Sequence, residues 1–207
     1  MKRRICLILA FTMLCGIYRG RAQEAVHSIS LLWGMSVPAG DNFLNRTAFV
    51  APQLEWELRF PRAWAVGISA GFIRGDETGR TSDRFEGDFV SGFSSRRLTL
   101  VPLTGYGRWY PLAGRGSLLQ PYASVGLGAE FVSYFITGET VSTSKAQRWS
   151  YLAAGEIGCR YTPRKEGRVS FDLRGSGLWG GSGWKTVEKK GDRRFGVALG
   201  INFKFKK

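Results

Sequence analysis

The chain has 207 residues and a mass of 23.0 kDa, which is enough for one domain. It holds 28 glycines, about twice the usual share, while 14% of its residues are aromatic and only 7 are proline. This composition favours a glycine-rich β-protein over a helical one. The net charge of +14 raises the question of nucleic-acid binding, but the basic residues are scattered over turns and loops, so we expect no nucleic-acid partner.

The N-terminus has the pattern of a secretory signal peptide. Basic residues at positions 2–4 precede an apolar run over 5–17, and small residues end at Ala22, after which we expect cleavage. An uncleaved membrane anchor is the alternative, but the run is shorter than the roughly 20 residues of a spanning helix. A lipoprotein signal ending at Cys15 would want a small residue before it, where Leu14 stands.

Residues 23–207 would then form the mature protein, with a net charge of +9 and a single cysteine, Cys159. One cysteine allows no intramolecular disulfide, and it is too little for a thiolate metal site. No later apolar stretch approaches the length of a spanning helix. If the protein crosses a membrane, it must therefore do so as a closed barrel, because strands satisfy their backbone groups only by pairing.

The mature sequence is a series of segments in which apolar and small or polar residues alternate. A period of two predicts strands with two unlike faces. In residues 64–72, for example, Trp64, Val66 and Ile68 alternate with Ala65, Gly67 and Ser69. The pattern predicts eight strands, over 28–37, 53–60, 64–72, 96–110, 123–135, 150–161, 169–179 and 195–205.

The connections between these segments alternate in length. Short ones at 61–63, 112–119 and 162–168 separate longer polar ones, which lie at 39–47, 75–92, 137–147 and 181–193. Short turns at one end and long loops at the other are typical of outer-membrane barrels. The sequence thus predicts an all-β fold, an eight-stranded antiparallel up-and-down transmembrane β-barrel with both termini on the periplasmic side.

The polar face of the strands decides between a membrane barrel and a soluble one, such as a lipocalin. That face combines glycine, serine and alanine with charges of both signs, and a soluble exterior has little need of so many glycines. Inside a narrow barrel, small residues make room for long ones. We therefore predict a network of paired charges inside the barrel, formed by Glu55, Glu57, Arg59, Arg108, Glu130, Glu156, Arg160, Asp172 and Arg174.

Aromatic residues cluster near the strand ends, as they do at lipid interfaces. We expect a periplasmic girdle of Trp64, Tyr110, Tyr122, Tyr161 and Phe205. We expect a second girdle, on the loop side, of Trp33, Phe72, Phe135, Trp149 and Trp179. A soluble sandwich with an aromatic core is the alternative.

The chain resembles the outer-membrane β-barrel domain family, the small OmpA/OmpX-like barrels of the porin superfamily in Bacteroidetes-type bacteria. The resemblance covers nearly the whole mature chain and rests on segments 33–40, 51–58, 121–128 and 195–205. It implies the outer membrane of a Gram-negative cell as location and the assembly machinery of that membrane as a partner. Phe203 and Phe205 would be the assembly signal, displaced inward because Lys206 and Lys207 follow.

The sequence offers little catalytic chemistry. The mature chain has one histidine, His27, at the start of the first strand and on the periplasmic side, away from the outer-leaflet lipids that a lipid-modifying barrel would act on. Glu55 and Glu57 share their strand face with Arg59, so an ion-pair network explains them. We predict no catalytic residues, no metal site and no cofactor.

The function expected is therefore non-enzymatic. The barrel would be a monomer with a structural role, or one that contacts lipopolysaccharide or partners through its loops. Charged pairing with lipid phosphates would use the loop-side basic residues Arg96, Arg97, Lys189, Lys190, Arg193 and Arg194. A narrow channel or carrier for small apolar solutes, a lipid-modifying enzyme and a soluble periplasmic lipid binder remain alternatives.

Overall fold

The computed structural model describes residues 25–39, 47–61, 63–85, 88–113, 117–138, 144–164, 167–183 and 190–205. The predicted signal peptide and its cleavage site lie outside them. The described residues contain no helix long and apolar enough to cross a membrane. The described residues form nine strands: β1 (Val26–Pro38), β2 (Ala48–Arg59), β3 (Trp64–Gly71), β4 (Ile73–Phe85), β5 (Asp88–Trp109), β6 (Leu119–Gly138), β7 (Ser144–Tyr161), β8 (Val169–Gly183) and β9 (Lys190–Phe205).

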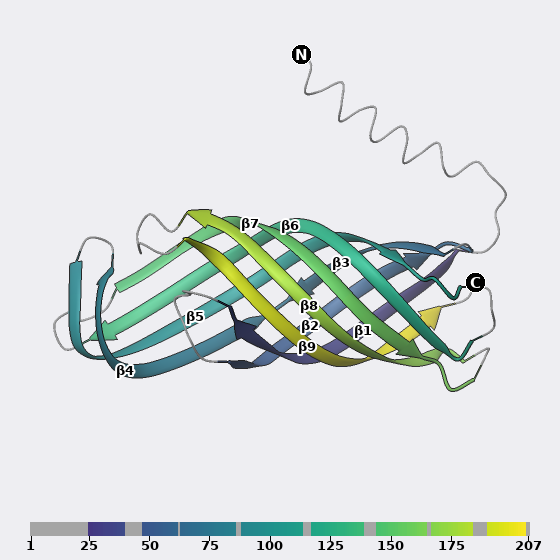
Figure 1. Ribbon diagram of the computed structural model, residues 1–207, viewed down its shortest axis with the longest axis horizontal. Coiled ribbons are helices and arrows are strands. Elements are labelled where there is room, and N and C mark those ends of the chain that lie inside the picture. Colours follow the sequence, from purple (N-terminus) through teal and green to yellow (C-terminus); the bar gives the residue numbers. More distant parts are fainter. Residues whose placement is uncertain are drawn as a thin grey trace, which may run out of the picture.

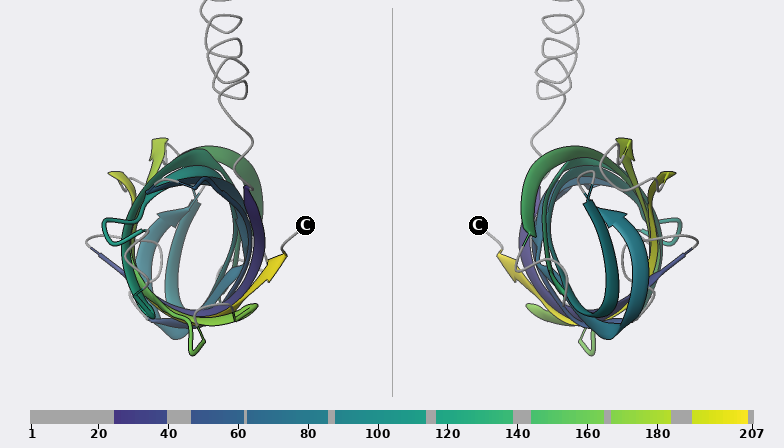
Figure 2. Two further views of the ribbon diagram at one scale, coloured as in Figure 1. Left: turned by 90° about the vertical axis from the view of Figure 1, so that its right-hand side faces the viewer. Right: turned by 90° about the vertical axis from the view of Figure 1, so that its left-hand side faces the viewer.

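All pairings are antiparallel, and β1 pairs with both β2 and β9, so the sheet closes on itself (Figure 1 and Figure 2). Strands β3 and β4 are one strand of the barrel, interrupted only at Phe72, because both continue the same register against β5. Pro52 and Pro102 lie beside this interruption, and neither can donate a ladder hydrogen bond. The barrel therefore has the predicted eight strands.

The strands are steeply staggered. Following paired residues once around the barrel, from Val26 on β1 through β2, β3, β5, β6, β7, β8 and β9, leads back to β1 at Ser36, ten residues further along. Such a shift fixes a tilt of roughly 35–45° and a narrow interior that side chains can fill. The loop ends and short-turn ends of the strands are separated along the long axis of the molecule (Figure 1).

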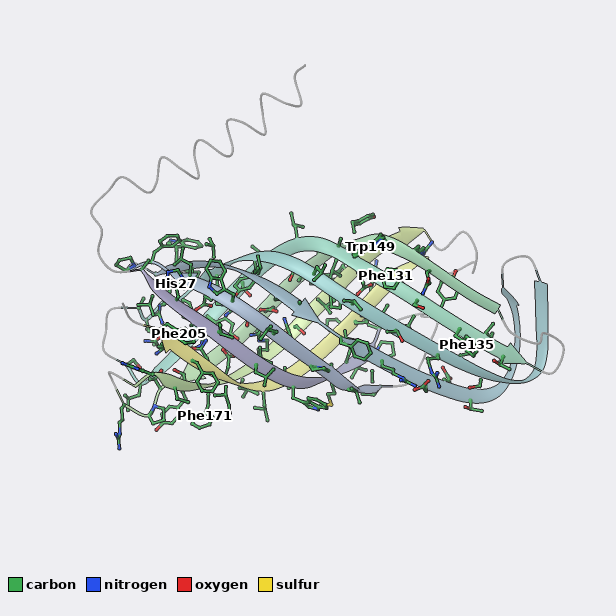
Figure 3. All side chains as sticks on the ribbon, turned by 180° about the vertical axis from the view of Figure 1, so that it is seen from behind. His27, Phe131, Phe135, Trp149, Phe171 and Phe205 are labelled. Carbon is green, nitrogen blue, oxygen red and sulfur yellow. The ribbon has the colours of Figure 1, made fainter. Side chains whose placement is uncertain are left out.

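Side chains divide between the two faces as predicted. Large apolar residues cover the outside: Leu127 and Val125 are each 75% exposed, and Ile157 is 71% exposed. In the predicted strand over 96–110, Leu103 points outward and Arg108 is fully buried. Aromatic side chains run along the outside from His27, Phe171 and Phe205 at the short-turn end to Phe131 and Trp149 toward the loop end (Figure 3).

The prediction of a polar loop over 75–92 is wrong. These residues belong to a β-hairpin of β4 and β5, which stay paired from Ile73 with Leu100 to Phe85 with Asp88. Among the described residues, strand β6 accompanies the hairpin as far as the pair of Ser94 and Gly138, and the hairpin continues beyond it as a two-stranded ribbon. The ribbon turns across the loop-side mouth of the barrel (Figure 1 and Figure 2). Cross-strand hydrogen bonds explain how a polar sequence without apolar alternation forms strands.

Strands also reach into the other expected loops. Strand β6 continues to Gly138 and β7 begins at Ser144, inside the predicted loop 137–147. Strand β8 continues to Gly183 and β9 begins at Lys190, inside the predicted loop 181–193. The barrel wall is therefore taller at the loop end than its apolar pattern indicates.

Inward-facing glycines make room for tyrosine rings. A Cβ atom at Gly67 would lie 2.4 Å from the Tyr106 hydroxyl, and one at Gly158 would lie 2.4 Å from the Tyr122 ring. Each tyrosine occupies the space that a side chain on the opposite position would need. These contacts connect the high content of glycine and aromatic residues in the sequence with the packing inside the barrel.

We predict that Gly67→Ala lowers the free energy of unfolding by about 1–3 kcal/mol, because the added methyl group overlaps the Tyr106 hydroxyl and the Trp56 carbonyl oxygen, both 2.4 Å away. Urea titration of the protein refolded in lipid vesicles measures this change. Gly107→Ala is the control, because no atom lies within 4 Å of its Cβ position. Equal stability of the two variants would contradict the packing described.

Candidate functional site

Arg108 is the centre of an ion-pair network that crosses the lumen in the half nearer the short turns. It projects inward from β5 and is fully buried. Its Nη1 atom donates to Glu57 at 2.6 Å, and its Nη2 atom donates to Glu55 at 2.6 Å and to Glu156 at 3.1 Å. One guanidinium therefore links the carboxylates of two opposed walls, β2 and β7.

Two further arginines complete the network. Arg160 on β7 donates to Glu57 at 2.8 Å and to Asp172 at 3.1 Å. Arg174 on β8 donates to Glu55 across the lumen and to Glu156 at 3.1 Å. These ion pairs bring together seven of the nine residues named from the sequence, as three guanidinium groups and four carboxylates in contact.

Two tyrosines that the sequence assigns to the periplasmic aromatic girdle are inside the barrel instead. Tyr110 donates to Glu57 at 3.0 Å, and Tyr122 donates to Asp172 at 2.6 Å. The Arg108 guanidinium lies 4.3 Å from the Tyr122 ring centroid, a cation–π contact. The girdle prediction is wrong for these two residues because proximity to a strand end does not determine which face of the strand a side chain occupies. The parity of Tyr110 with Arg108 indicates the inward face.

Two members of the predicted network stand apart from it. Arg59 lies at the rim of the short-turn end, where its guanidinium donates to Gln120 and covers the Tyr110 ring at 4.1 Å. Glu130 instead pairs with Arg194 in a separate contact nearer the loop end. Arg194 was expected among the exposed basic residues, and that expectation is wrong. It occupies the inward parity of β9 and is 5% exposed.

Between these two layers of charge, the described part of the chain encloses a cavity of about 60 Å³, lined mainly by small residues such as Gly34, Ser69, Ala154 and Ser176. This volume holds about two water molecules. Toward the loop end the lumen becomes apolar, with a buried cluster of Ala48, Ile73, Leu98, Leu100, Val132, Tyr134 and Ile136.

The remaining loop-side basic residues lie at several levels of the rim. Arg97 faces outward on β5, and Arg193 is exposed on β9. Arg96 is half-buried and shares the inward parity of Leu98, so its expected role at the surface is wrong for that side chain. Lys189 lies outside the described residues, and only the backbone of Lys190 is described.

The short-turn end carries the other predicted residues. Phe203 and Phe205 on β9 face outward, where they are 44% and 52% exposed. His27 pairs with Phe205 in the sheet and lies 5.8 Å from the Trp56 ring. Within the described part of the chain, no group of three or more His, Cys, Asp or Glu residues could hold a metal ion.

The geometry defines a class: a closed, eight-stranded barrel with an apolar exterior and a charged interior, the fold of small outer-membrane proteins. No protein-family model matches the chain, and no curated protein matches it in sequence. Among solved structures it is similar to Neisserial surface protein A, with a TM-score of 0.59 and 13% identity over 87% of this chain and 97% of that one.

Two other outer-membrane proteins have comparable similarity. OprG of Pseudomonas aeruginosa has a TM-score of 0.57 and 15% identity, covering 89% of this chain and 98% of its own. Ail, the attachment invasion locus protein of Yersinia pestis, was solved in complex with the heparin analogue sucrose octasulfate. It has a TM-score of 0.55 and 16% identity, covering 88% of this chain and 100% of its own. At these identities the likeness shows the fold alone.

We predict that Arg108→Met lowers the free energy of unfolding by about 3–5 kcal/mol, because it leaves Glu55 and Glu57 buried with fewer partners. Arg97→Met is the matched control. Its ion pair with Asp76 is half-exposed, so its loss should cost less than about 1 kcal/mol. Urea titration in vesicles compares the two variants, and a similar cost for both would show that the buried network is not a source of stability.

Proposed function

We propose that this protein is a non-enzymatic barrel of the bacterial outer membrane, closed to solutes, that acts through its surface. The observation that carries the proposal is the ion-pair network around Arg108, which joins β2, β5, β7 and β8 across the lumen. A solute would have to break several buried charge contacts at once to pass. Each buried carboxylate of the network is occupied as an ion-pair partner, which favours a structural role over acid–base chemistry.

The proposal includes the route to the membrane. Residues 1–22 would be removed as a signal peptide, and the closing strand with Phe203 and Phe205 would be read by the assembly machinery. The barrel would act as a monomer, with its short turns in the periplasm and the β4–β5 hairpin at the cell surface. Support for this orientation comes from the difference between the two ends of the barrel: one carries short turns, and the other carries the β4–β5 hairpin (Figure 1).

A carrier for small apolar solutes is the second candidate, and the apolar loop-side lumen favours it. Leu100, Val132 and Ile136, however, are each 1% exposed and pack against one another. Below them the cavity lined by described residues measures about 60 Å³, well under the roughly 300 Å³ at which small-molecule sites begin. The closed barrel therefore accounts better for the observations.

At the outer surface we propose contact with anionic groups, with lipopolysaccharide as the first partner. Basic residues rim the loop end, including Arg74, Arg97 and Arg193, and charge-assisted pairing with phosphate is favourable there. Ail, which shares the fold, was crystallised with a polysulfated sugar. Lipopolysaccharide and other polyanions offer related oxyanions to a basic rim.

Conductance across a planar lipid bilayer tests closure. We expect no steady current steps from the refolded protein, because ion pairs block the lumen. A variant with Glu55, Arg108 and Arg174 all changed to alanine should conduct, since three long cross-lumen side chains are removed at once. A heat-dependent shift on a gel confirms that the variant still folds as a barrel. Steady conductance of the unmodified protein would reject the closed barrel.

A further inference from the structure

The outer boundary of the apolar belt can be read along four adjacent strands. Toward the loop end, the outward-facing positions change from apolar to polar or charged within four residues on β4, β5 and β7. The order is Phe72, at the interruption before β4, then Arg74 and Asp76 on β4; Val101, Thr99 and Arg97 on β5; Trp149 and Gln147 on β7. Strand β6 lies between β5 and β7, with Ser133 beside Thr99 and Gln147, and with the aromatic Phe135 one outward position further, beside Arg97. This face therefore crosses from acyl chains to headgroups at these positions.

At this boundary the side chains of Arg74 and Arg97 both form ion pairs with the carboxylate of Asp76. Arg97 Nε donates to Asp76 Oδ1 at 2.6 Å, and Arg74 Nε donates to Asp76 Oδ2 at 3.2 Å. The three side chains are 44–51% exposed, so the cluster is open to the membrane interface. Both of these hydrogen bonds use the Nε atoms of the arginines. Thr99 pairs with Arg74 in the sheet, two residues from Arg97 on β5.

The charges of the cluster do not cancel. Asp76 is partly desolvated, which raises the pKa of its carboxyl group, but Arg97 and Arg74 lower it more, so the net pKa shift is downward and Asp76 stays ionised at neutral pH. Two positive charges around one negative charge leave an excess of +1. The carboxylate both holds the arginines together and repels any second anion that approaches them.

We propose that Arg74 and Arg97 form a binding site for the phosphate headgroup of an outer-leaflet lipid, and that Asp76 limits the affinity of this site. The inference rests on the proposed function and deepens its surface contact. The source of the phosphate is a lipid, because the site lies directly above Phe72, which is 38% exposed, and beside Val50, which pairs with Arg74 and is 43% exposed. A bound lipid would pack its chains on this apolar surface and place its headgroup at the arginines.

Neutralising an arginine and neutralising the aspartate should have opposite effects on lipid binding. This difference distinguishes a binding site from a cluster with only a structural role. Arg97→Gln removes a phosphate ligand and should weaken binding about two- to fivefold. Asp76→Asn removes the competing anion and should tighten binding by a similar factor. If the cluster merely braced the hairpin, both substitutions would act in the same direction, because either one breaks the same ion pair.

The probe is bis-phosphorylated lipid A, added to the full mature protein refolded in uncharged detergent micelles, with the bound fraction counted by native mass spectrometry. Arg168→Gln is the matched control, since it removes an exposed arginine at the short-turn end. Dephosphorylated lipid A tests whether the phosphate is required, and inorganic pyrophosphate as competitor tests whether a soluble anion suffices.

Weaker binding by Arg97→Gln, tighter binding by Asp76→Asn and unchanged binding by Arg168→Gln support the site. Any one of three results would overturn the proposed site. Asp76→Asn fails to tighten binding, dephosphorylated lipid A binds as well as lipid A, or pyrophosphate displaces the lipid at equimolar concentration. Failure of the unmodified protein to bind any lipid A would instead reject lipopolysaccharide contact as a part of the proposed function.

Discussion

Buried charges that reach one another across the lumen are the interaction on which the rest of this barrel depends. An ion isolated inside a protein costs several kcal/mol, and a closed sheet of eight strands leaves little room for water to offset that cost. Arg108, Arg160 and Arg174 are tolerated because four carboxylates meet them at hydrogen-bond distance. The same contacts tie opposite walls together, so one arrangement gives both cohesion and closure.

Small inward-facing residues provide the space for this network, because they leave room in the lumen for the long charged and aromatic side chains. Gly67 and Gly158 accept the rings of Tyr106 and Tyr122, and the Tyr106 and Tyr122 rings flank the Arg108 guanidinium at 4.6 and 4.3 Å. The interior thus contains a layer of glycine, aromatic ring and arginine in contact. Outside, along the apolar belt, the same strands present large apolar side chains, and this division suits a wall that separates lipid from a polar, water-poor lumen.

The period of two was sufficient to predict the strand faces, the strand number and most of the charge network, because each depends on local alternation. Positions set by long-range pairing could not be predicted. The hairpin over 75–92 forms through β4–β5 hydrogen bonds and has no apolar alternation to reveal it. Arg194 looked exposed because it stands in a basic segment, yet its parity on β9 brings it to Glu130, 64 residues away. The ion-pair cluster at Asp76 likewise depends on a strand pairing that the sequence pattern does not contain.

A double-mutant cycle between Glu57 and Arg160 tests the central claim most directly. The pair joins β2 to β7 at 2.8 Å, and both side chains are 1% exposed. Unfolding free energies of Glu57→Gln, Arg160→Met and the double variant, measured in lipid vesicles, give the coupling energy of the pair. The network described here predicts a favourable coupling of at least about 1 kcal/mol. Additive effects of the two substitutions, with no coupling, would contradict it.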